Sequence, residues 1–405
     1  MKEWKEYKAA DFCINVTDGT HDSPKPKEEG HYLITSKHLQ NNDIDFSSAY
    51  RISEEDYLKV IQRSRVEQFD ILFSMIGTIG NTVRVVSPEV DFAVKNMAIF
   101  KMGQNDLKSK WLYYWLKSST AKSYISSRLA GSTQSYLTLD TLRNFPIYAP
   151  DERTMQDITA ILSSIDDKID LNNRINHNLE EQAQALYKSW FVDFEPFKGG
   201  KFVESELGMI PEGWSIATIE SLSSRIASGG TPRSLDSSYY EGNIKWFTTK
   251  ELKDCFLFDS EKHISDTAVQ NSAAKFFPTG SVLMAIYASP TVGRLGILTE
   301  PSTFNQAAVA IIPQDNIGTE YVYMTLLSER DNLNNLASGA AQQNLNVGIV
   351  KNYQVIRPTD EIIMSFKTTA EPIFSAIRNN SKEIHALSAL RDSLIPQLMS
   401  GLITC

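Results

Sequence analysis

A long heptad pattern of apolar residues constrains this chain more than any other feature. Residues 150–190 read as one helix, along which mainly apolar side chains recur alternately four and three residues apart. That spacing of about 3.5 residues keeps one stripe of a helix against a single partner and is typical of left-handed coiled-coil packing. Asp151 is a suitable N-cap for this helix. The stripe consists of Ile158, Leu162, Ile165, Ile169, Asn172, Asn176, Leu179, Ala183, Leu186 and Trp190.

The same stripe occurs again 208 residues later, in the same register. Asn172 and Asn380 are equivalent, and polar residues inside such a stripe mark register. Two prolines in the second stretch predict a kink or restart near Pro372 and an end of the helix before Pro396. The alternative is that the two amphipathic helices lie on separate cores. The second stripe consists of Phe366, Ala370, Ile373, Ile377, Asn380, Ile384, Leu387, Arg391, Leu394 and Leu398.

The repeat extends into the segments that precede each helix. Leu137 matches Leu345 at the spacing of 208, and the offset drifts slightly upstream, as loop insertions would cause. Short strand-like runs (70–75, 83–86, 97–100, 281–286, 307–312) alternate with helical runs at 108–118 and 319–327. We therefore predict an α+β fold with two similar globular domains, 1–149 and 199–357, and two long antiparallel helices, 150–198 and 358–405. The object would have pseudo-twofold symmetry.

The composition narrows the class of protein but not its ligand. The hydrophobic content of 42% suits a soluble protein, and three scattered cysteines with no export segment favour the cytoplasm. The net charge of −9 hides an uneven distribution, because residues 150–195 hold 10 acidic against 4 basic residues. Local clusters, rather than the total charge, decide where a phosphate backbone can bind.

Motifs of catalysis are missing from the sequence. No Gly-x-x-x-x-Gly-Lys-Ser/Thr loop occurs, and no Pro-Pro pair that an adenine-methyltransferase motif would need. Asp151 followed by Asp166-Asp167-Lys168 imitates a nuclease metal site, but fifteen helical rises of ~1.5 Å separate Asp151 from Asp166, so a solvated helix face is the better interpretation. The six histidines show no metal-ligand spacing. We predict no metal site.

Several of these stretches resemble one family. The run 161–176 (ILSSIDDKIDLNNRIN), with Trp190-Phe191-Val192-Asp193-Phe194 after it, resembles the central helix of type I restriction-modification specificity (HsdS) subunits. Residues 208–214 resemble the entry to their second target recognition domain, and 394–401 the end of their second helix. Residues 18–24 and 228–232 resemble two common openings of such domains. The resemblance covers essentially the whole chain.

This resemblance implies a subunit without chemistry of its own. It would bind a bipartite, asymmetric site in double-stranded DNA, one half per domain. Two methyltransferase (HsdM) subunits and the motor-nuclease (HsdR) subunits would dock on it, and those partners would use S-adenosylmethionine, ATP and Mg²⁺. We expect no membrane association. The alternatives are a self-contained enzyme, such as a nickase or methyltransferase, and a two-headed protein scaffold.

Three loops in each domain carry side chains suited to phosphates and base edges. Their recurrence at equivalent places favours a shared use in DNA binding, although glycine and glutamine can also simply shape turns. Lys37 and Lys250, equivalent by the repeat, are the best candidates for phosphate contacts. In the first domain the candidates are Thr20, His21, Lys25, Lys27, Lys37, Thr78, Asn81, Ser132, Thr133, Gln134 and Ser135. In the second they are Thr231, Arg233, Lys250, Thr291, Arg294, Gln342, Gln343 and Asn344.

Overall fold

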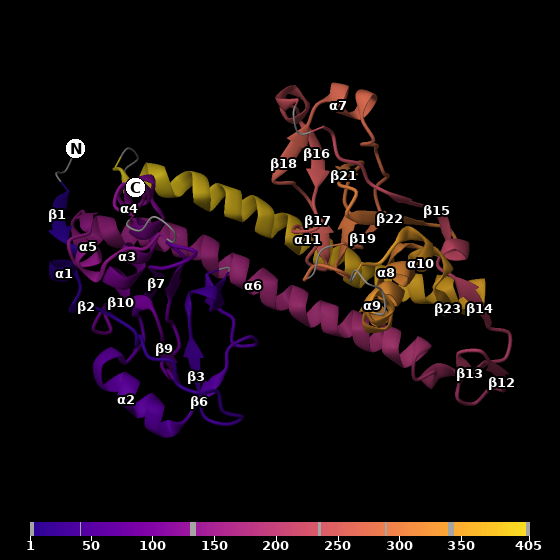
Figure 1. Ribbon diagram of the computed structural model, residues 1–405, viewed down its shortest axis with the longest axis horizontal. Helices are drawn as coiled ribbons and strands as arrows, with labels where there is room; N and C mark the ends of the chain where they lie inside the picture. Colours follow the sequence, from indigo (N-terminus) through magenta and orange to yellow (C-terminus); the bar gives the residue numbers. More distant parts are fainter. Residues whose placement is uncertain are drawn as a thin grey trace. The chain divides into compact units, whose positions relative to one another are not determined.

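The chain folds into two units, and each unit is assembled from two separate stretches of sequence. A computed structural model describes residues 4–40, 42–129, 135–233, 236–287, 290–338 and 344–401. Unit 1 comprises residues 1–168 and 387–405, and unit 2 comprises residues 169–386. Figure 1 shows both long helices, α6 (Glu152–Phe191) and α11 (Asp360–Met399), each of 40 residues. Unit 1 therefore contains the start of α6 and the end of α11, and unit 2 contains the opposite halves.

The two helices pair in antiparallel fashion, as the heptad pattern predicted. Within unit 2, Asn172 Nδ2 donates to Glu383 Oε2 (2.8 Å), and Asn380 Nδ2 donates to Asn176 Oδ1 (3.0 Å). Residue numbers thus rise along α6 as they fall along α11. Every position of both predicted stripes is buried or half-buried. Asp151 caps α6 by accepting a hydrogen bond from Thr154 N (3.1 Å). The alternative of two unpaired helices is wrong.

The prediction that the second long helix ends before Pro396 is wrong, and so is the predicted restart near Pro372. The helix continues through both Pro372 and Pro396, so neither a restart nor an early end occurs. A proline leaves the carbonyl four residues earlier without its helix partner. Both prolines are exposed, so water can satisfy the carbonyls of Thr368 and Asp392 instead.

Unit 1 contains a four-stranded sheet in the order β2-β10-β7-β8 and a three-stranded sheet in the order β6-β3-β9. Two-stranded pairs β1·β11 and β4·β5 complete it. The strands are β1 (Lys5–Lys8), β2 (Asn15–Asp18), β3 (His31–Ile34), β4 (Leu39–Gln40), β5 (Asp43–Ile44), β6 (Arg51–Ile52), β7 (Ile71–Ser74), β8 (Thr82–Arg84), β9 (Phe92–Val94), β10 (Met97–Lys101) and β11 (Pro146–Ala149). The helices are α1 (Ala9–Phe12), η1 (Ser36–His38), α2 (Glu54–Ser64), α3 (Asp106–Lys117), α4 (Ser119–Ser126) and α5 (Leu139–Arg143).

Unit 2 contains a five-stranded sheet in the order β15-β22-β19-β20-β17 and a three-stranded sheet in the order β18-β16-β21. The pairs β12·β13 and β14·β23 complete it. The strands are β12 (Phe202–Ser205), β13 (Gly208–Pro211), β14 (Ser215–Thr218), β15 (Ser223–Ser228), β16 (Ile244–Phe247), β17 (Cys255–Leu257), β18 (Lys262–Ile264), β19 (Val282–Ala285), β20 (Leu295–Leu298), β21 (Thr303–Phe304), β22 (Ala308–Pro313) and β23 (Gln354–Arg357). The remaining helices are η2 (Glu195–Phe197), η3 (Glu220–Leu222), η4 (Ser237–Tyr240), α7 (Asp266–Asn271), α8 (Thr319–Ser328), α9 (Arg330–Ser338) and α10 (Val347–Asn352).

The two units share one topology, which confirms the internal repeat. β2-β10-β7-β8 corresponds to β15-β22-β19-β20, and β6-β3-β9 corresponds to β18-β16-β21, each with one parallel pair. The correspondence extends to single bonds. Leu137 N donates to Met75 O, and its predicted equivalent Leu345 N donates to Ile286 O, both at 2.9 Å. The two globular domains and the mixed helix and strand content are therefore as predicted.

The core of each unit takes in one end of each long helix. In unit 1, Ile158 and Leu162 of α6 pack in the same core as Ile395 and Leu398 of α11. In unit 2, Phe191 of α6 contacts the ring of Phe366 of α11, with ring centroids 4.9 Å apart. The long helices are thus parts of both cores and not simple spacers between finished domains.

Candidate DNA interface

In unit 1 the predicted loops meet at one edge, where several strands end. β2 and β7 both run antiparallel to β10, so their carboxyl ends lie beside the start of β10. β3 and β9 are parallel and end together. Backbone hydrogen bonds join the segments that follow: Thr20 N donates to Val94 O (3.0 Å), and Lys95 N donates to Ile34 O (2.8 Å).

The other two loops of unit 1 join the same edge through β7 and η1. Asn81 Nδ2 donates to Leu39 O (2.9 Å), which holds the turn at 77–81 beside the segment that carries Lys37. Ile76, two residues after the end of β7, forms a β-bridge with Tyr136. Lys37, Thr78 and Ser135 are exposed, and Thr20 and Asn81 are half-buried. These five predicted residues therefore belong to one polar edge.

Unit 2 repeats this arrangement with different side chains. Gly230 N donates to Phe304 O and Asn305 N donates to Phe247 O, both at 2.9 Å, which matches the pair of bonds in unit 1. Thr231, Arg233 and Lys250 are exposed at this edge, and Thr291, Arg294 and Asn344 are half-buried.

Lys37 and Lys250 are presented by the same kind of turn. Thr35 N donates to His38 Nδ1 (2.9 Å), and in unit 2 Thr248 N donates to Glu251 Oε2 (2.6 Å). In each turn the side chain of the fourth residue thus accepts a hydrogen bond from the backbone of the first residue. The lysine between them is exposed in both units. The sequence offset of 213 had already paired these segments.

Not all predicted residues come to this edge. Lys27 forms a bridge with Arg51 of β6, beside the start of β3 and therefore at the opposite end of that strand from Ile34. Lys25 is exposed on the loop that leads there. Ser132, Thr133, Gln134, Gln342 and Gln343 lie outside the described residues.

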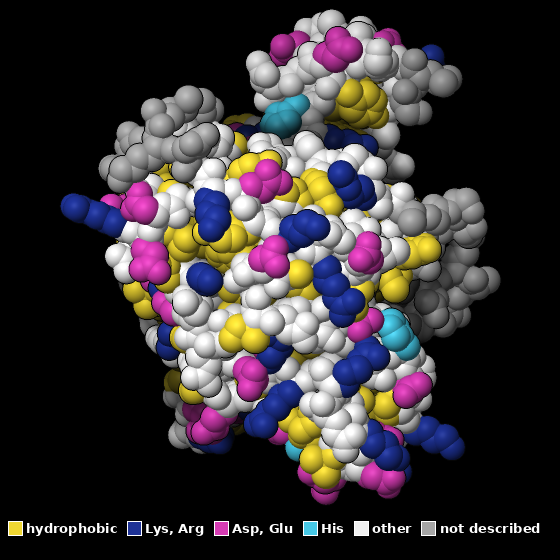
Figure 2. All heavy atoms as spheres, turned by 90° about the vertical axis from the view of Figure 1, so that its left-hand side faces the viewer, with side chains coloured by type: hydrophobic (Ala, Val, Ile, Leu, Met, Phe, Trp, Pro, Cys, Tyr) yellow, Lys and Arg dark blue, Asp and Glu magenta, His cyan; other side chains and the backbone are white. Residues whose placement is uncertain are grey.

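Charge alone does not mark an interface. On the face drawn in Figure 2, Lys and Arg side chains are interspersed with Asp and Glu, without a large field of one sign. At the edge itself, the Asp18 carboxylate has two side-chain neighbours: His21 Nε2 lies 2.8 Å from Asp18 Oδ2, and Arg63 Nη2 donates to Asp18 Oδ1 (2.5 Å).

Comparison with known proteins identifies the family. Residues 1–181 and 211–384 both match the type I restriction modification DNA specificity domain. The chain belongs to this family of specificity subunits. It is 25% identical to the type I restriction enzyme HindI specificity subunit of Haemophilus influenzae, covering 99% of this chain and 100% of that protein. It is 26% identical to the MjaIX specificity subunit of Methanocaldococcus jannaschii, covering 99% and 93%.

A solved structure shows the same fold. The S subunit of the type I restriction-modification system from M. genitalium matches with a TM-score of 0.57 at 13% identity, covering 98% of this specificity subunit and 96% of that chain. In the described part of the specificity subunit, no helix has the length and hydropathy needed to cross a bilayer. Nor do the described residues contain a group of three or more His, Cys, Asp or Glu side chains that could hold a metal ion.

The sequence prediction missed two residues at this edge of the specificity subunit. Asn96 lies between β9 and β10, and Gln306 lies at the equivalent place between β21 and β22. His21 Nδ1 is 2.8 Å from Asn96 Oδ1, and the Thr231 hydroxyl donates to Gln306 Oε1. The offset of 210 that pairs Asn96 with Gln306 also pairs Trp4 with Trp214, so the repeat contained the signal needed to find them.

A buried polar network lies where α6, α11 and α3 meet in unit 1. Arg391 Nη1 donates to Asp166 Oδ1 (2.8 Å), and the Tyr114 hydroxyl donates to Asp166 Oδ2 (2.8 Å). Burial lowers the pKa of Arg391, but Asp166 and Asp392 more than offset this effect and raise it overall. Asp166 thus has an ion-pair partner within the fold, which agrees with rejecting a nuclease site here.

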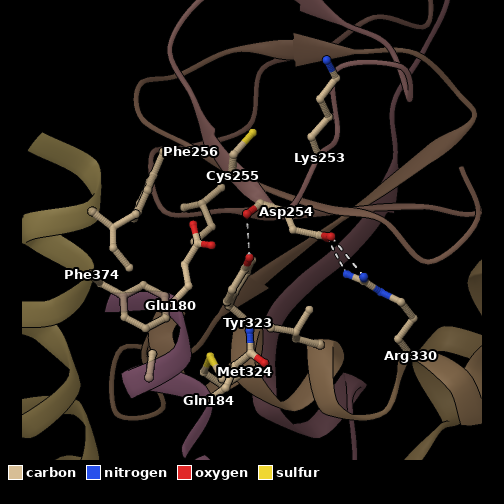
Figure 3. Close-up of a pocket in the computed structure, with 14 residues that line it drawn as sticks. Glu180, Gln184, Lys253, Asp254, Cys255, Phe256, Tyr323, Met324, Arg330 and Phe374 are labelled. Atoms are coloured by element: carbon tan, nitrogen blue, oxygen red, sulfur yellow. Dashed lines mark hydrogen bonds and ion pairs between the residues drawn. The ribbon is translucent and has the colours of Figure 1, made fainter. Parts of the chain in front are cut away.

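The equivalent place in unit 2 holds a cavity of about 510 Å³. At the offset of 208, Arg391 is replaced by Ala183 and Asp166 by Phe374, so the ion pair is absent and space remains. Figure 3 shows Glu180 pointing from α6 into this cavity and the Asp254–Arg330 ion pair at its side. Burial raises the pKa of Glu180. The side chains at this place therefore differ between the two halves of the specificity subunit.

Proposed function

We propose that this specificity subunit binds a bipartite, asymmetric site in double-stranded DNA and reads one half-site with each unit. The observation that carries the proposal is the repeated polar edge. Equivalent loops meet at equivalent strand ends in both units, but they carry different side chains, such as His21 in unit 1 and Thr231 in unit 2. A repeat with unlike halves suits a site with unlike halves, whereas a homodimer suits a palindrome.

The subunit would act within a complex and would have no chemistry of its own. We infer that two methyltransferase (HsdM) subunits dock on it and that motor-nuclease (HsdR) subunits join them. S-adenosylmethionine, ATP and Mg²⁺ would be bound by those partners and not by this chain. The isolated chain would then bind DNA weakly, and sequence-specific binding would need the methyltransferase subunits.

The decisive experiment is single-molecule methylome sequencing of the host with and without this gene. Loss of one methylated adenine motif that has two defined halves and an unspecified spacer would support the proposal. If the lost motif is continuous, or if no methylation motif is lost, the proposal of a bipartite site is contradicted. Methyl transfer or DNA cleavage by the purified chain alone would support a self-contained enzyme instead.

Lysine variants test whether the polar edge contacts DNA. Lys37→Ala and Lys250→Ala should each weaken binding by the assembled complex equally for all sequences, and each should reduce the slope of log affinity against log salt by about 1. Lys59→Ala is the matched control, because Lys59 lies on α2 in an exposed pair with Glu55. If all three variants have equal salt slopes, this edge is not part of the DNA interface.

A further inference from the structure

Two side-chain amides occupy equivalent positions in the two recognition units. Asn96 is one of two residues between β9 and β10, and Gln306 lies in the three-residue connection between β21 and β22. Each connection leads from the three-stranded sheet to the larger sheet of its unit. Asn96 is half-buried and Gln306 is exposed, so both amides can be reached at the edge described above.

The opening loop of each unit is built to reach this amide. A Cβ on Gly19 would lie 2.2 Å from Val94 O, and a Cβ on Gly229 would lie 2.2 Å from Phe304 O. Only glycine permits so close an approach between the loop and the strand end. The second residue after each glycine then meets the amide: His21 contacts Asn96, and Thr231 contacts Gln306. This geometry explains why both opening motifs contain glycine at this place.

Backbone conformation does not account for the amides. Asn96 has a φ of 54°, a left-handed conformation in which asparagine is common. Gln306 is not among the described residues with positive φ, yet it carries the same functional group. What the two positions share is therefore the amide itself and its hydrogen bond to the opening loop.

A held amide still has the groups needed to read a base. Among the described residues, each amide makes a single hydrogen bond, to His21 or to Thr231. In both units that bond is made to the amide oxygen and occupies one of its lone pairs, so a second lone pair and the N–H donors remain side by side. Asn and Gln use this pair to accept from N6 and donate to N7 of adenine in the major groove.

We propose that Asn96 and Gln306 are equivalent base-contacting residues, each reading one adenine in the half-site of its unit, with His21 and Thr231 as their positioning residues. The inference rests on the proposed bipartite function and names side chains that carry it out. Because the amide is tethered before DNA binds, little side-chain freedom remains to be lost on contact.

The test uses the complete complex with its methyltransferase subunits and a DNA library randomised at every position of both half-sites. Gln306→Ala should lower the preference for adenine at one base pair of one half-site by about 5- to 150-fold and leave the other half-site unchanged. Asn96→Ala should do the same in the other half. Gln306→Glu should move the preference from adenine towards cytosine, because a carboxylate accepts from cytosine N4.

Positioning is tested by Thr231→Val, which keeps the shape of the side chain and removes the hydroxyl donor. It should weaken selectivity at the same base pair as Gln306→Ala, and the double variant should be no worse than Gln306→Ala. Gln314→Ala is the control, because Gln314 follows the opposite end of β22 and donates to Ser221 O (3.0 Å). It should leave selectivity unchanged.

The outcomes separate the inference from the function on which it rests. If the wild-type complex selects no bipartite site, the proposed function fails. If the complex does select a bipartite site, but the alanine variants weaken binding to all sequences equally or change nothing, the amides are not base contacts and this inference fails. Unchanged preferences at the other base pairs of the same half-site show that the substituted unit is folded, so loss of folding cannot imitate the expected result.

Discussion

The ion pair between Arg391 and Asp166 gives the sharpest test of how the long helices are fixed in unit 1. The side chain of Arg391 is 12% exposed and that of Asp166 is 22% exposed. Removing one partner of a largely buried pair leaves an uncompensated charge and typically costs about 3–5 kcal/mol. Because the network is partly open to water, we expect Arg391→Ala to destabilise unit 1 by about 3 kcal/mol.

The matched control removes the whole network at constant volume. Tyr114→Phe/Asp166→Leu/Arg391→Met removes the ion pair together with the tyrosine hydroxyl that donates to it, and such replacements are often neutral or stabilising. Unit 2 offers a natural precedent, because Ala183 and Phe374 occupy the places equivalent to Arg391 and Asp166. The triple variant should therefore be within about 1 kcal/mol of the wild type.

Native-state hydrogen exchange is the suitable assay, because a single unfolding free energy is not well defined for a chain with two units. Peptides from α3 and β7 report on unit 1, and peptides from α8 and β19 report on unit 2. Arg391→Ala should speed exchange about 100-fold or more in unit 1 and much less in unit 2. Wild-type protection in Arg391→Ala, or equal loss in the single and triple variants, would refute this reasoning.

Further predictions concern the opening loop, two titrating groups and the helices. Gly19→Ala should displace the opening loop, because the new Cβ would meet Val94 O, and footprinting should show loss of contacts in one half-site only. Burial lowers the pKa of His31, but hydrogen bonds to Glu54 and Asp91 raise it overall. The stabilisation by protonated His31 should therefore be full below pH ~6.5 and should be lost as the pH rises through the folded-state pKa. In thermal unfolding, His31→Phe should abolish this pH dependence. Burial lowers the pKa of Lys117 from 10.5 to about 7. Between these two pH values the unfolded state binds more protons than the folded state, so the free energy of unfolding should rise with pH in the wild type but not in Lys117→Met. Inserting one heptad into both long helices should lengthen the spacer in the methylome motif without altering either half-site; altered bases with an unaltered spacer would contradict this.

The sequence predicted those features that repeat with a fixed period. The heptad stripe predicted the antiparallel helices, and the 208-residue offset predicted equivalent bonds such as those of Leu137 and Leu345. It failed at Pro396, because the cost of a proline depends on whether the freed carbonyl reaches water. The sequence placed Arg391 in the stripe but did not predict its ion pair, since its partner Asp166 lies 225 residues away in the sequence.

The candidate interface was predictable by position but not by side chain. Loops that follow aligned strand ends must meet, so Thr20 and Thr78 could be found from the strand pattern. The proposed role of Asn96 could not be predicted from the strand pattern, because it depends on a 2.8 Å contact with His21, which is 75 residues away in the sequence. Lys27 was included only because it is near Thr20 in sequence, and the bridge to Arg51 places it at the other end of β3.

Each unit packs one end of both long helices into its core, and this sharing explains how two unlike units can be stable in one chain. Unit 1 needs the end of α11, because Ile395, Leu398 and Met399 are at most 3% exposed in its core. Burial of such side chains contributes about 1.5–3 kcal/mol each, so the second repeat stabilises the first. Unit 2 depends on α6 in the same way, through Tyr187 and Phe191. The helices therefore fix both cores, whereas exposed loop residues such as His21 and Thr231 belong to neither core. If the units read half-sites as proposed, substitutions of loop residues such as His21 or Thr231 would change half-site preference while the paired helices, and the stability they provide, stay the same.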